Sequence, residues 1–311
     1  MVKTLNKKIY LGTELNPVTA MLKNDFSIVD NQVIDYKDGE LIYNFDIGLC
    51  FDDEEKQRIF EFYEIPYIGS RRLQKNEQAF LMKKLGINHP PTFSTVYNSD
   101  SSSMISMICD YSNSHEFVVK PFGGARGIGQ SVVNKQDLYG FFEDCHGNMD
   151  TTDLREKYNV SNCSEQNCVE ENYFRDCAKS NTSMLQEKIN IEKEWRVIYF
   201  YNETPIIIER KVPETVTEWQ SNASVTGEGK QVFIEDMDPY LGNEIIELST
   251  KIASILNTPF LSMDFYLGTD DKLGVLEFQM EMGYRYVNKF QLQHKIVSSV
   301  KDMIKDKYEK A

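Results

Sequence analysis

Residues 116–133 contain the feature that most limits how this chain can fold and what it can bind. A short β-type run over 117–119 ends at Lys120, and Pro121 then breaks the strand. Four glycines follow within the next eight residues: Gly123, Gly124, Gly127 and Gly129. Because glycine has no Cβ, the backbone N–H groups of such a loop can approach a ligand closely. Clustered N–H donors beside a lysine ammonium group suit a polyphosphate.

The glycine loop matches neither of two common phosphate-binding fingerprints. Its lysine precedes the glycines, and the Gly-Lys-Ser/Thr ending of a Walker A loop is absent. The segment Gly124–Gly129 also lacks the glycine spacing of a dinucleotide fingerprint, and β-type residues follow it instead of a helix. A tight hairpin that merely requires glycine is the alternative. The rest of the chain must therefore decide between the two interpretations.

Composition limits the class of protein. At 311 residues there is room for two or three subdomains. The formal charge of −14 argues against nucleic acid as a main partner, but it leaves room for a local basic pocket that binds a nucleotide. The sequence has no signal-peptide pattern and no apolar run of about 18 residues, and its cysteines are too sparse for a disulfide framework. We therefore expect a cytoplasmic protein with neither a membrane nor a nucleic-acid partner.

Hydrophobic patterning predicts an α/β chain in three parts. Residues 1–72 alternate strand and helix patterns, including strands at 8–11 and 41–45, and predict a small α/β domain. A helix is expected over 73–86, with Lys75 in its first turn. The polar segment 144–183 has almost no strand pattern, and we interpret it as an insertion or lid. The expected domains are 1–72, 73–183 with the glycine loop, and 184–311.

Two β-hairpins carry charged residues in the second half. The first runs over 195–209, contains Arg196 near its start, and is flanked by Glu194 and Arg210. In the second, 260–281, strand alternation places Glu277, Gln279 and Glu281 on one face. Asp264 lies on the partner strand and can meet this row. Such a face requires solvent, arginine partners or a divalent cation, and a solvated acidic face is the simplest alternative.

The order of these motifs, from about residue 70 to 290, is more specific than any one of them. The series is Lys75 before Gly-Ile-x-x-Pro-Pro-Thr, Val-Val-Lys120-Pro with the glycine loop, Leu-Gln-Glu187-Lys-Ile, Glu-Trp-Arg196, Glu-Arg210, Ser-Asn222, Met-Asp264-Phe and Leu-Glu277-Phe-Gln279. It resembles the ATP-grasp superfamily, most of all the RimK-type and glutathione-synthetase-like carboxylate–amine ligases. The resemblance implies two α+β lobes that clasp ATP, preceded by a small α/β domain.

The resemblance also implies how ATP would be bound. Lys75 and Lys120 would hold the nucleotide phosphates from two sides, and the glycine loop would cover them. The strand that joins the lobes would contact adenine with Gln186, Glu187, Lys188 and Ile189. Glu194 would contact the ribose or pair with the neighbouring arginine.

Further residues would serve metal binding and catalysis by the same resemblance. Arg196 and Arg210 would face the γ-phosphate and the acyl phosphate, where delocalised donors stabilise developing charge. The ligands of Mg²⁺ would be Asp264, Glu277 and Gln279, with Asn222 nearby.

The implied reaction is ADP-forming ligation. A carboxylate attacks the γ-phosphate of ATP, and an amine displaces phosphate from the acyl phosphate to form an amide or peptide bond. The substrate would be an amino acid, a peptide or a protein. Phosphoryl transfer without ligation, and a nucleotide-binding module with a regulatory or assembly role, are the alternatives. Dimers and tetramers are common in the family, so a homo-oligomer is compatible with the resemblance.

Three features depart from the family pattern. Gln279 stands where asparagine is usual, which keeps an amide oxygen on a longer arm, and Glu281 is a second candidate oxygen ligand. Gln220 stands where an arginine is expected before Ser221-Asn222, and residues 224–230 stand where a basic, double-glycine stretch is usual. Because Gln220 and 224–230 occupy positions for substrate handling, two alternatives stay open: an unusual acceptor, or loss of this half of the chemistry. Arg285, after the metal strand, is a candidate clamp for a substrate carboxylate, with a surface arginine as the alternative.

Overall fold

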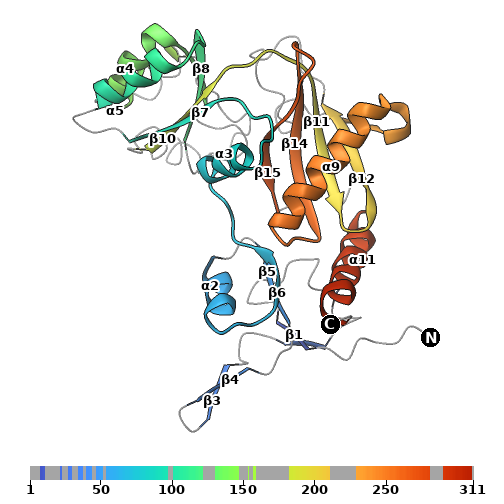
Figure 1. Ribbon diagram of the computed structural model, residues 1–311. Helices are drawn as coiled ribbons and strands as arrows, with labels where there is room; N and C mark the ends of the chain where they lie inside the picture. Colours follow the sequence, from blue (N-terminus) through green and yellow to red (C-terminus); the bar gives the residue numbers. More distant parts are fainter. Residues whose placement is uncertain are drawn as a thin grey trace.

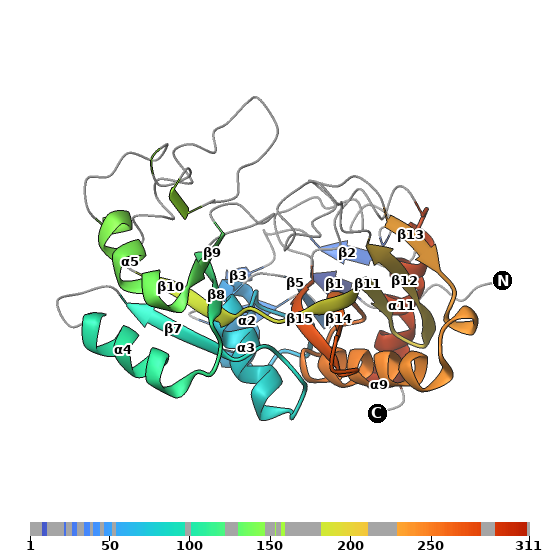
Figure 2. The ribbon, with the colours of Figure 1, turned by 90° about the horizontal axis from the view of Figure 1, so that it is seen from above.

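The structure is a computed structural model of the chain, and its described residues form three larger sheets and one two-stranded sheet (Figure 1). It describes residues 8–10, 22, 27–29, 34–37, 40–43, 47–51, 54–96, 101–121, 130–146, 153, 157–158, 182–210, 229–280 and 290–309. In Figure 2 the sheet from the middle of the chain (green) lies with its helices on the left, and the sheet from the C-terminal part of the chain (orange) lies on the right. Among the helices in these ranges, none is both long and apolar enough to cross a lipid bilayer.

The N-terminal sheet is parallel, in the order β2-β1-β5-β6. Its strands are β1 (Lys8–Tyr10), β2 (Ser27–Val29), β5 (Ile47–Phe51) and β6 (Tyr67–Ser70), with α2 (Glu54–Phe62) between the last two. Gly48 lets the Phe60 ring of α2 lie against β5, since a Cβ at Gly48 would stand 2.5 Å from the ring. The strand expected at 41–45 is β4 (Glu40–Tyr43), which pairs with β3 (Ile34–Lys37) as a separate hairpin.

The second sheet is antiparallel, in the order β7-β10-β8-β9. Its strands are β7 (Thr92–Val96), β8 (Glu116–Pro121), β9 (Ser131–Asn134) and β10 (Thr182–Glu187). Helices α4 (Ser101–Tyr111) and α5 (Leu138–His146), the latter preceded by the 3-10 turn η1 (Lys135–Asp137), pack against it around Phe117 and Leu185. Tyr158, from the segment interpreted as an insertion, is buried there against Phe141, with ring centroids 4.9 Å apart.

The boundary expected between residues 183 and 184 falls inside β10. Because β10 pairs with both β7 and β8, its residues belong to the second sheet through Glu187. We therefore propose that the boundary between the two lobes lies after Glu187.

The third sheet is antiparallel, in the order β13-β12-β11-β14-β15. Its strands are β11 (Ile191–Phe200), β12 (Glu203–Arg210), β13 (Gly229–Val232), β14 (Phe260–Gly268) and β15 (Leu273–Gln279). The turn η2 (Ile234–Asp236) leads into α9 (Pro239–Ile255), and α11 (Gln293–Ile304) continues into the π-turn η3 (Lys305–Glu309). Asp238 caps α9 by accepting from the N–H groups of Tyr240 and Leu241, which explains why the helix begins here.

Strand alternation divides the side chains of the third sheet between two faces. Trp195 and Val197 of β11, with Met263 of β14, belong to the core that contains Ile245 and Ile252 of α9. Even-numbered neighbours point the other way, and Ile198 and Phe260 pack with α11 and the N-terminal sheet. This second face also carries Glu194 and Arg196 of β11 and Asp264 of β14.

Helix α3 (Lys75–Lys84) connects the two antiparallel sheets, and it contacts both β7 and β15. The buried amide of Gln78 fixes this contact, because its oxygen accepts from the backbone N–H of Phe278 at 3.0 Å. The helix that the sequence predicts over 73–86 is confirmed in slightly shorter form.

Candidate active site

Two ion-paired arginines lie on the face of the third sheet that is opposite α9. Arg196 of β11 stands directly across from Asp264 of β14, and Glu194 stands across from Arg210 of β12. Because residues two apart on one strand share a face, Glu194 and Arg196 project together. Three adjacent strands therefore bring four charged side chains to one place.

The contacts within this cluster are short. Arg196 donates through Nε and one terminal nitrogen to the two oxygens of Asp264, at 2.7 and 2.8 Å. Arg210 donates to Glu194 at 2.5 Å and to Asp264 at 3.0 Å. Side chains of Arg210, Glu194 and Asp264 are only 6–7% exposed. With two cations and two anions, these four side chains balance in charge, as buried charges require.

Asp264 is a carboxylate rather than a carboxylic acid in this setting. Burial by itself raises the pKa of Asp264, but the guanidinium groups of Arg196 and Arg210 outweigh burial and hold the pKa below its usual range. The group therefore carries a full negative charge at neutral pH and can act as a hard oxygen ligand.

Glu277 of β15 stands directly opposite Asp264, as the alternation of the last hairpin predicts. An irregularity in pairing follows at once, since Phe265 pairs with Val275 and leaves Leu276 as the extra residue. The carboxylate of Glu277 is half-buried. The amide nitrogen of the exposed Gln279 donates to Glu277 Oε1 at 3.3 Å. Within the described residues no group of three or more His, Cys, Asp or Glu forms a metal site, so a cation here would need further oxygen donors.

Lys120 is the second-last residue of β8 and donates from Nζ to Oε1 of Gln186 on β10, at 2.5 Å. The pKa of Lys120 is lowered to about 8, mainly by burial and also by the positive charge of Lys75 on α3. Three carboxylates act in the opposite direction: Glu277, Glu194 and Asp264. The charge of Lys120 is therefore influenced by Lys75 of α3 and by three carboxylates of the third sheet.

Of the four residues expected to contact adenine, Gln186 and Glu187 are the last two of β10, and Lys188 and Ile189 come directly after it. Gln186 is 3% exposed and turned toward Lys120, whereas Glu187 accepts from the hydroxyl of Ser112 at 2.5 Å. Lys188 forms an ion pair with Glu116 at 2.9 Å. These side-chain contacts fix the start of the segment 188–190, which connects the second sheet to β11 and includes Ile189.

Several expected site residues lie outside the described ranges. These are Gly123, Gly124, Gly127, Gly129, Gln220, Asn222, Glu281 and Arg285. Their roles stay predictions.

One residue near Lys120 was missed by the sequence analysis. His89 lies in the connector after α3, and its ring contacts both Gln186 and the backbone of Val275. In the sequence, His89 is marked only by its place between Asn88 and two prolines, and this pattern does not indicate which residues it contacts.

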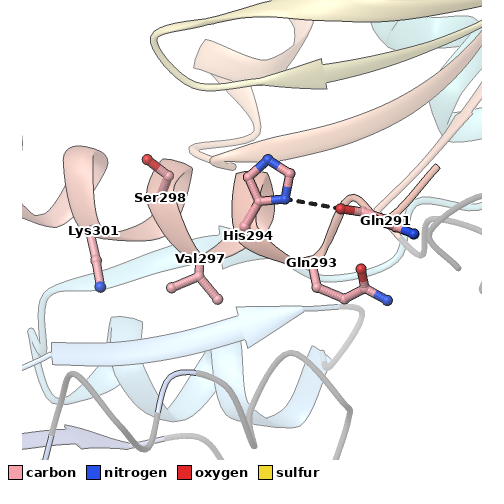
Figure 3. A pocket seen from close by; sticks show the side chains of 6 residues that line it. All are labelled: Gln291, Gln293, His294, Val297, Ser298 and Lys301. Carbon is pink, nitrogen blue, oxygen red and sulfur yellow. Dashed lines mark hydrogen bonds between the residues drawn. The ribbon is translucent and has the colours of Figure 1, made fainter.

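A cavity of about 630 Å³ lies along α11 (Figure 3). The described residues that line it come from this helix and the turn before it: Gln291, Gln293, His294, Val297, Ser298 and Lys301. None of the charged residues above lines it.

Comparisons with known proteins concern the whole chain. No protein-family model matches the sequence, and no curated protein sequence matches it significantly. Among solved structures, the D-alanyl-alanine synthetase A of Vibrio cholerae is 12% identical, with a TM-score of 0.57 over 98% of this chain and 99% of that chain. A RiPP-associated ATP-grasp ligase of Chryseobacterium gregarium, in complex with ADP and a leader and core peptide, is 15% identical, with a TM-score of 0.54 over 97% of each chain.

A third similar structure is the D-alanine–D-alanine ligase of Bacillus anthracis complexed with ATP. It is 16% identical, with a TM-score of 0.52 over 98% of this chain and 100% of that chain. The chain therefore has the α/β ATP-grasp fold, in which a parallel N-terminal sheet precedes two lobes built on antiparallel sheets. D-alanine ligases and a RiPP ATP-grasp ligase share this fold.

Proposed function

We propose that this protein is an ATP-dependent, ADP-forming carboxylate–amine ligase of the RimK type. One observation carries the proposal. Lys120 of the second sheet lies within electrostatic reach of Asp264 and Glu277 of the third. In these roles Lys120 would bind phosphate and the two carboxylates would bind a cation beside it, which is what a metal–nucleotide complex requires.

The residues present fit Mg²⁺ and ATP. Lys75 and Lys120 would bind phosphate oxygens as point charges. Asp264, Glu277 and the amide oxygen of Gln279 would hold Mg²⁺, because each offers the hard oxygen that this ion prefers. When bound, Mg²⁺ neutralises phosphate charge and orients the γ-phosphate. Since Gln279 donates its nitrogen to Glu277 here, its amide must turn over to act as a ligand.

The arginines would stabilise the charge that develops during transfer. Arg196 and Arg210 each keep their planar guanidinium oriented through Asp264, and Glu194 further fixes Arg210. Donors held in place before the reaction need no reorganisation when the substrate carboxylate attacks the γ-phosphate. An acyl phosphate forms as ADP departs, and an amine then displaces phosphate to give the amide.

For the substrate we propose an amino acid, a peptide or a protein. The Chryseobacterium enzyme with this fold was solved with a leader and core peptide, which favours including peptides among the acceptors that are tested. A net charge of −14 favours an amine partner that is not strongly acidic.

The test is ADP release from ATP and Mg²⁺, with pooled amino acids and pooled peptides as substrates. Release that requires both a carboxylate and an amine, and that is lost in Glu277→Gln, supports ligation. Release that requires only one substrate supports phosphoryl transfer. ATP binding without release from any pool supports a nucleotide-binding module, whereas the absence of ATP binding contradicts the proposal as a whole.

A further inference from the structure

The connector between α3 and β7 joins the two lobes through hydrogen bonds on both of its sides. Asn88 is bonded to β15 through two hydrogen bonds. Its side-chain nitrogen donates to the backbone carbonyl of Leu273 at 3.1 Å, and its backbone carbonyl accepts from the N–H of Val275 at 3.0 Å. On the other side, the carbonyl of Pro91 accepts from the N–H of Glu187 at 2.9 Å. His89 lies between these two attachments.

The partners of His89 Nδ1 and of the Gln186 amide determine which of these atoms donate. The carbonyl oxygen of Val275 lies 2.7 Å from Nδ1 and can only accept, so Nδ1 carries the proton. Lys120 has only donors, so Gln186 must turn its oxygen toward Lys120. The amide nitrogen of Gln186 then faces His89 Nε2, at 3.2 Å.

A neutral imidazole with its proton on Nδ1 satisfies the contacts of the ring with Val275 and Gln186, and its Nε2 also lies 3.2 Å from the hydroxyl oxygen of Thr92. Nε2 is then the acceptor for the amide of Gln186, which also lies 3.2 Å from the hydroxyl oxygen of Thr92. That hydroxyl donates to the carbonyl of Pro90 at 2.8 Å. Burial lowers the pKa of His89 to about 4, so the ring is neutral near pH 7.

We propose that His89 is a positioning residue for ATP binding: it holds the amide of Gln186 so that the oxygen faces Lys120, and it anchors this lysine to the strand that carries Glu277. The inference rests on the proposed function, in which Lys120 binds the nucleotide phosphates. None of the roles that the sequence predicts for the site residues involves His89.

The physical effect of His89 is on the orientation of one amide. Without the acceptor at Nε2, the amide nitrogen of Gln186 keeps only the hydroxyl oxygen of Thr92 as an acceptor. The amide can then turn over more readily and present its nitrogen to Lys120, where two donors would oppose each other. Lys120 would then lose its fixed partner and sample several rotamers of its long side chain. Ordering such a side chain opposes binding, so an ammonium group that is already fixed binds phosphate more tightly.

The test measures binding of Mg²⁺-ATP by calorimetry for His89→Asn, Lys120→Met and the double variant. Asparagine can still donate to the carbonyl of Val275, but it is too short to accept from Gln186. We expect His89→Asn to weaken ATP binding about three- to tenfold, the range for one lost hydrogen bond. In the Lys120→Met background the same substitution should change affinity less than about twofold, because residues that act through one another are not additive.

Two controls separate this inference from a general loss of structure. His294→Asn makes the same substitution on α11, where His294 Nδ1 also bonds a backbone carbonyl, and it should leave ATP binding unchanged. His89→Gln, whose longer side chain supplies an acceptor, should recover part of the affinity. The nitrogen chemical shifts of His89 should show a proton on Nδ1 and none on Nε2.

Each outcome has a separate meaning. Additive effects of His89→Asn and Lys120→Met, or a proton on Nε2 of His89, overturn the inference and leave the proposed function standing. If the unaltered protein does not bind ATP, or if Lys120→Met binds ATP as tightly as the unaltered protein, the proposed function fails and the inference falls with it.

Discussion

Arg196 donates to both carboxylate oxygens of Asp264, through Nε at 2.7 Å and through a terminal nitrogen at 2.8 Å, and the two residues face each other across β11 and β14. Such bidentate pairs are stronger and more specific in geometry than single hydrogen bonds. Arg210 adds a third contact to the same carboxylate. Asp264 is therefore both the centre of a buried ion-pair cluster and a proposed ligand of Mg²⁺.

Asp264→Asn should destabilise the protein and abolish activity together. The change removes one negative charge from a buried cluster and leaves two guanidinium groups opposite Glu194 alone. Breaking a buried pair in this way costs about 3–5 kcal/mol of unfolding free energy. Denaturant unfolding of the variant measures this loss.

Glu277→Gln is the matched control for Asp264→Asn. Its side chain is half-buried and receives a hydrogen bond from Gln279. We expect a stability change within about 1 kcal/mol and an equally complete loss of ADP release. If both variants were equally destabilised, the distinction between the two carboxylates would be wrong.

ATP affinity should fall as the pH rises through the pKa of Lys120. This pKa is lowered to about 8, so the free protein carries the charged ammonium below that pH and the neutral amine above it. Phosphate favours the charged form. By proton linkage, ATP should bind about tenfold more weakly at about pH 9 than at about pH 7. Calorimetry at the two pH values measures the difference.

Lys120→Arg provides the comparison, because arginine stays charged throughout this range. Its ATP affinity should be almost independent of pH between the same two values. A pH dependence that is unchanged in Lys120→Arg would assign the titration to another group.

Gln279→Ala should lower the apparent affinity for Mg²⁺ without unfolding the protein. Gln279 is exposed, and its amide contacts the carboxylate of Glu277 at 3.3 Å. Loss of a residue that orients a metal ligand typically weakens metal binding by about 10- to 100-fold. Titration of ADP release with Mg²⁺ measures the change, and Gln279→Asn, which keeps the amide, should retain more affinity than alanine. Equal Mg²⁺ dependence in all three proteins would exclude a role for this position.

Gly274→Ala should destabilise the hairpin that carries Asp264 and Glu277. Gly274 pairs with Tyr266, and a Cβ there would stand 2.4 Å from the tyrosine ring, which is itself buried. Overpacking of this kind costs about 1–3 kcal/mol. Thermal or denaturant unfolding checks the sign and the size.

Gly140→Ala is the same substitution in a different environment. The nearest atom to a new Cβ is the Tyr158 hydroxyl at 3.7 Å, and Gly140 lies within α5. Alanine should therefore stabilise the protein by up to about 1 kcal/mol through its helix propensity. Destabilisation of similar size at both glycines would contradict the close approach at Gly274.

Much of the framework follows from the amino-acid sequence. Period-two alternation in the last hairpin predicts that Asp264 can face Glu277, and the pairing of β14 with β15 confirms it. The strand before Lys120 and the helix that begins at Lys75 also lie where the patterns predict. These features are local, since alternation, caps and strand breakers are set by residues close to one another in the chain.

Contacts between distant residues were decided only by the tertiary structure. Arg196 and Asp264 are 68 residues apart, and His89 and Val275 are 186 apart, so no local pattern couples them. The assignment of β10 to the second sheet and the irregular pairing after Asp264 likewise depend on which strands meet. The sequence thus determined which residue types stand on each strand. Packing of the sheets decided which charges pair, because burial makes each of them require a partner.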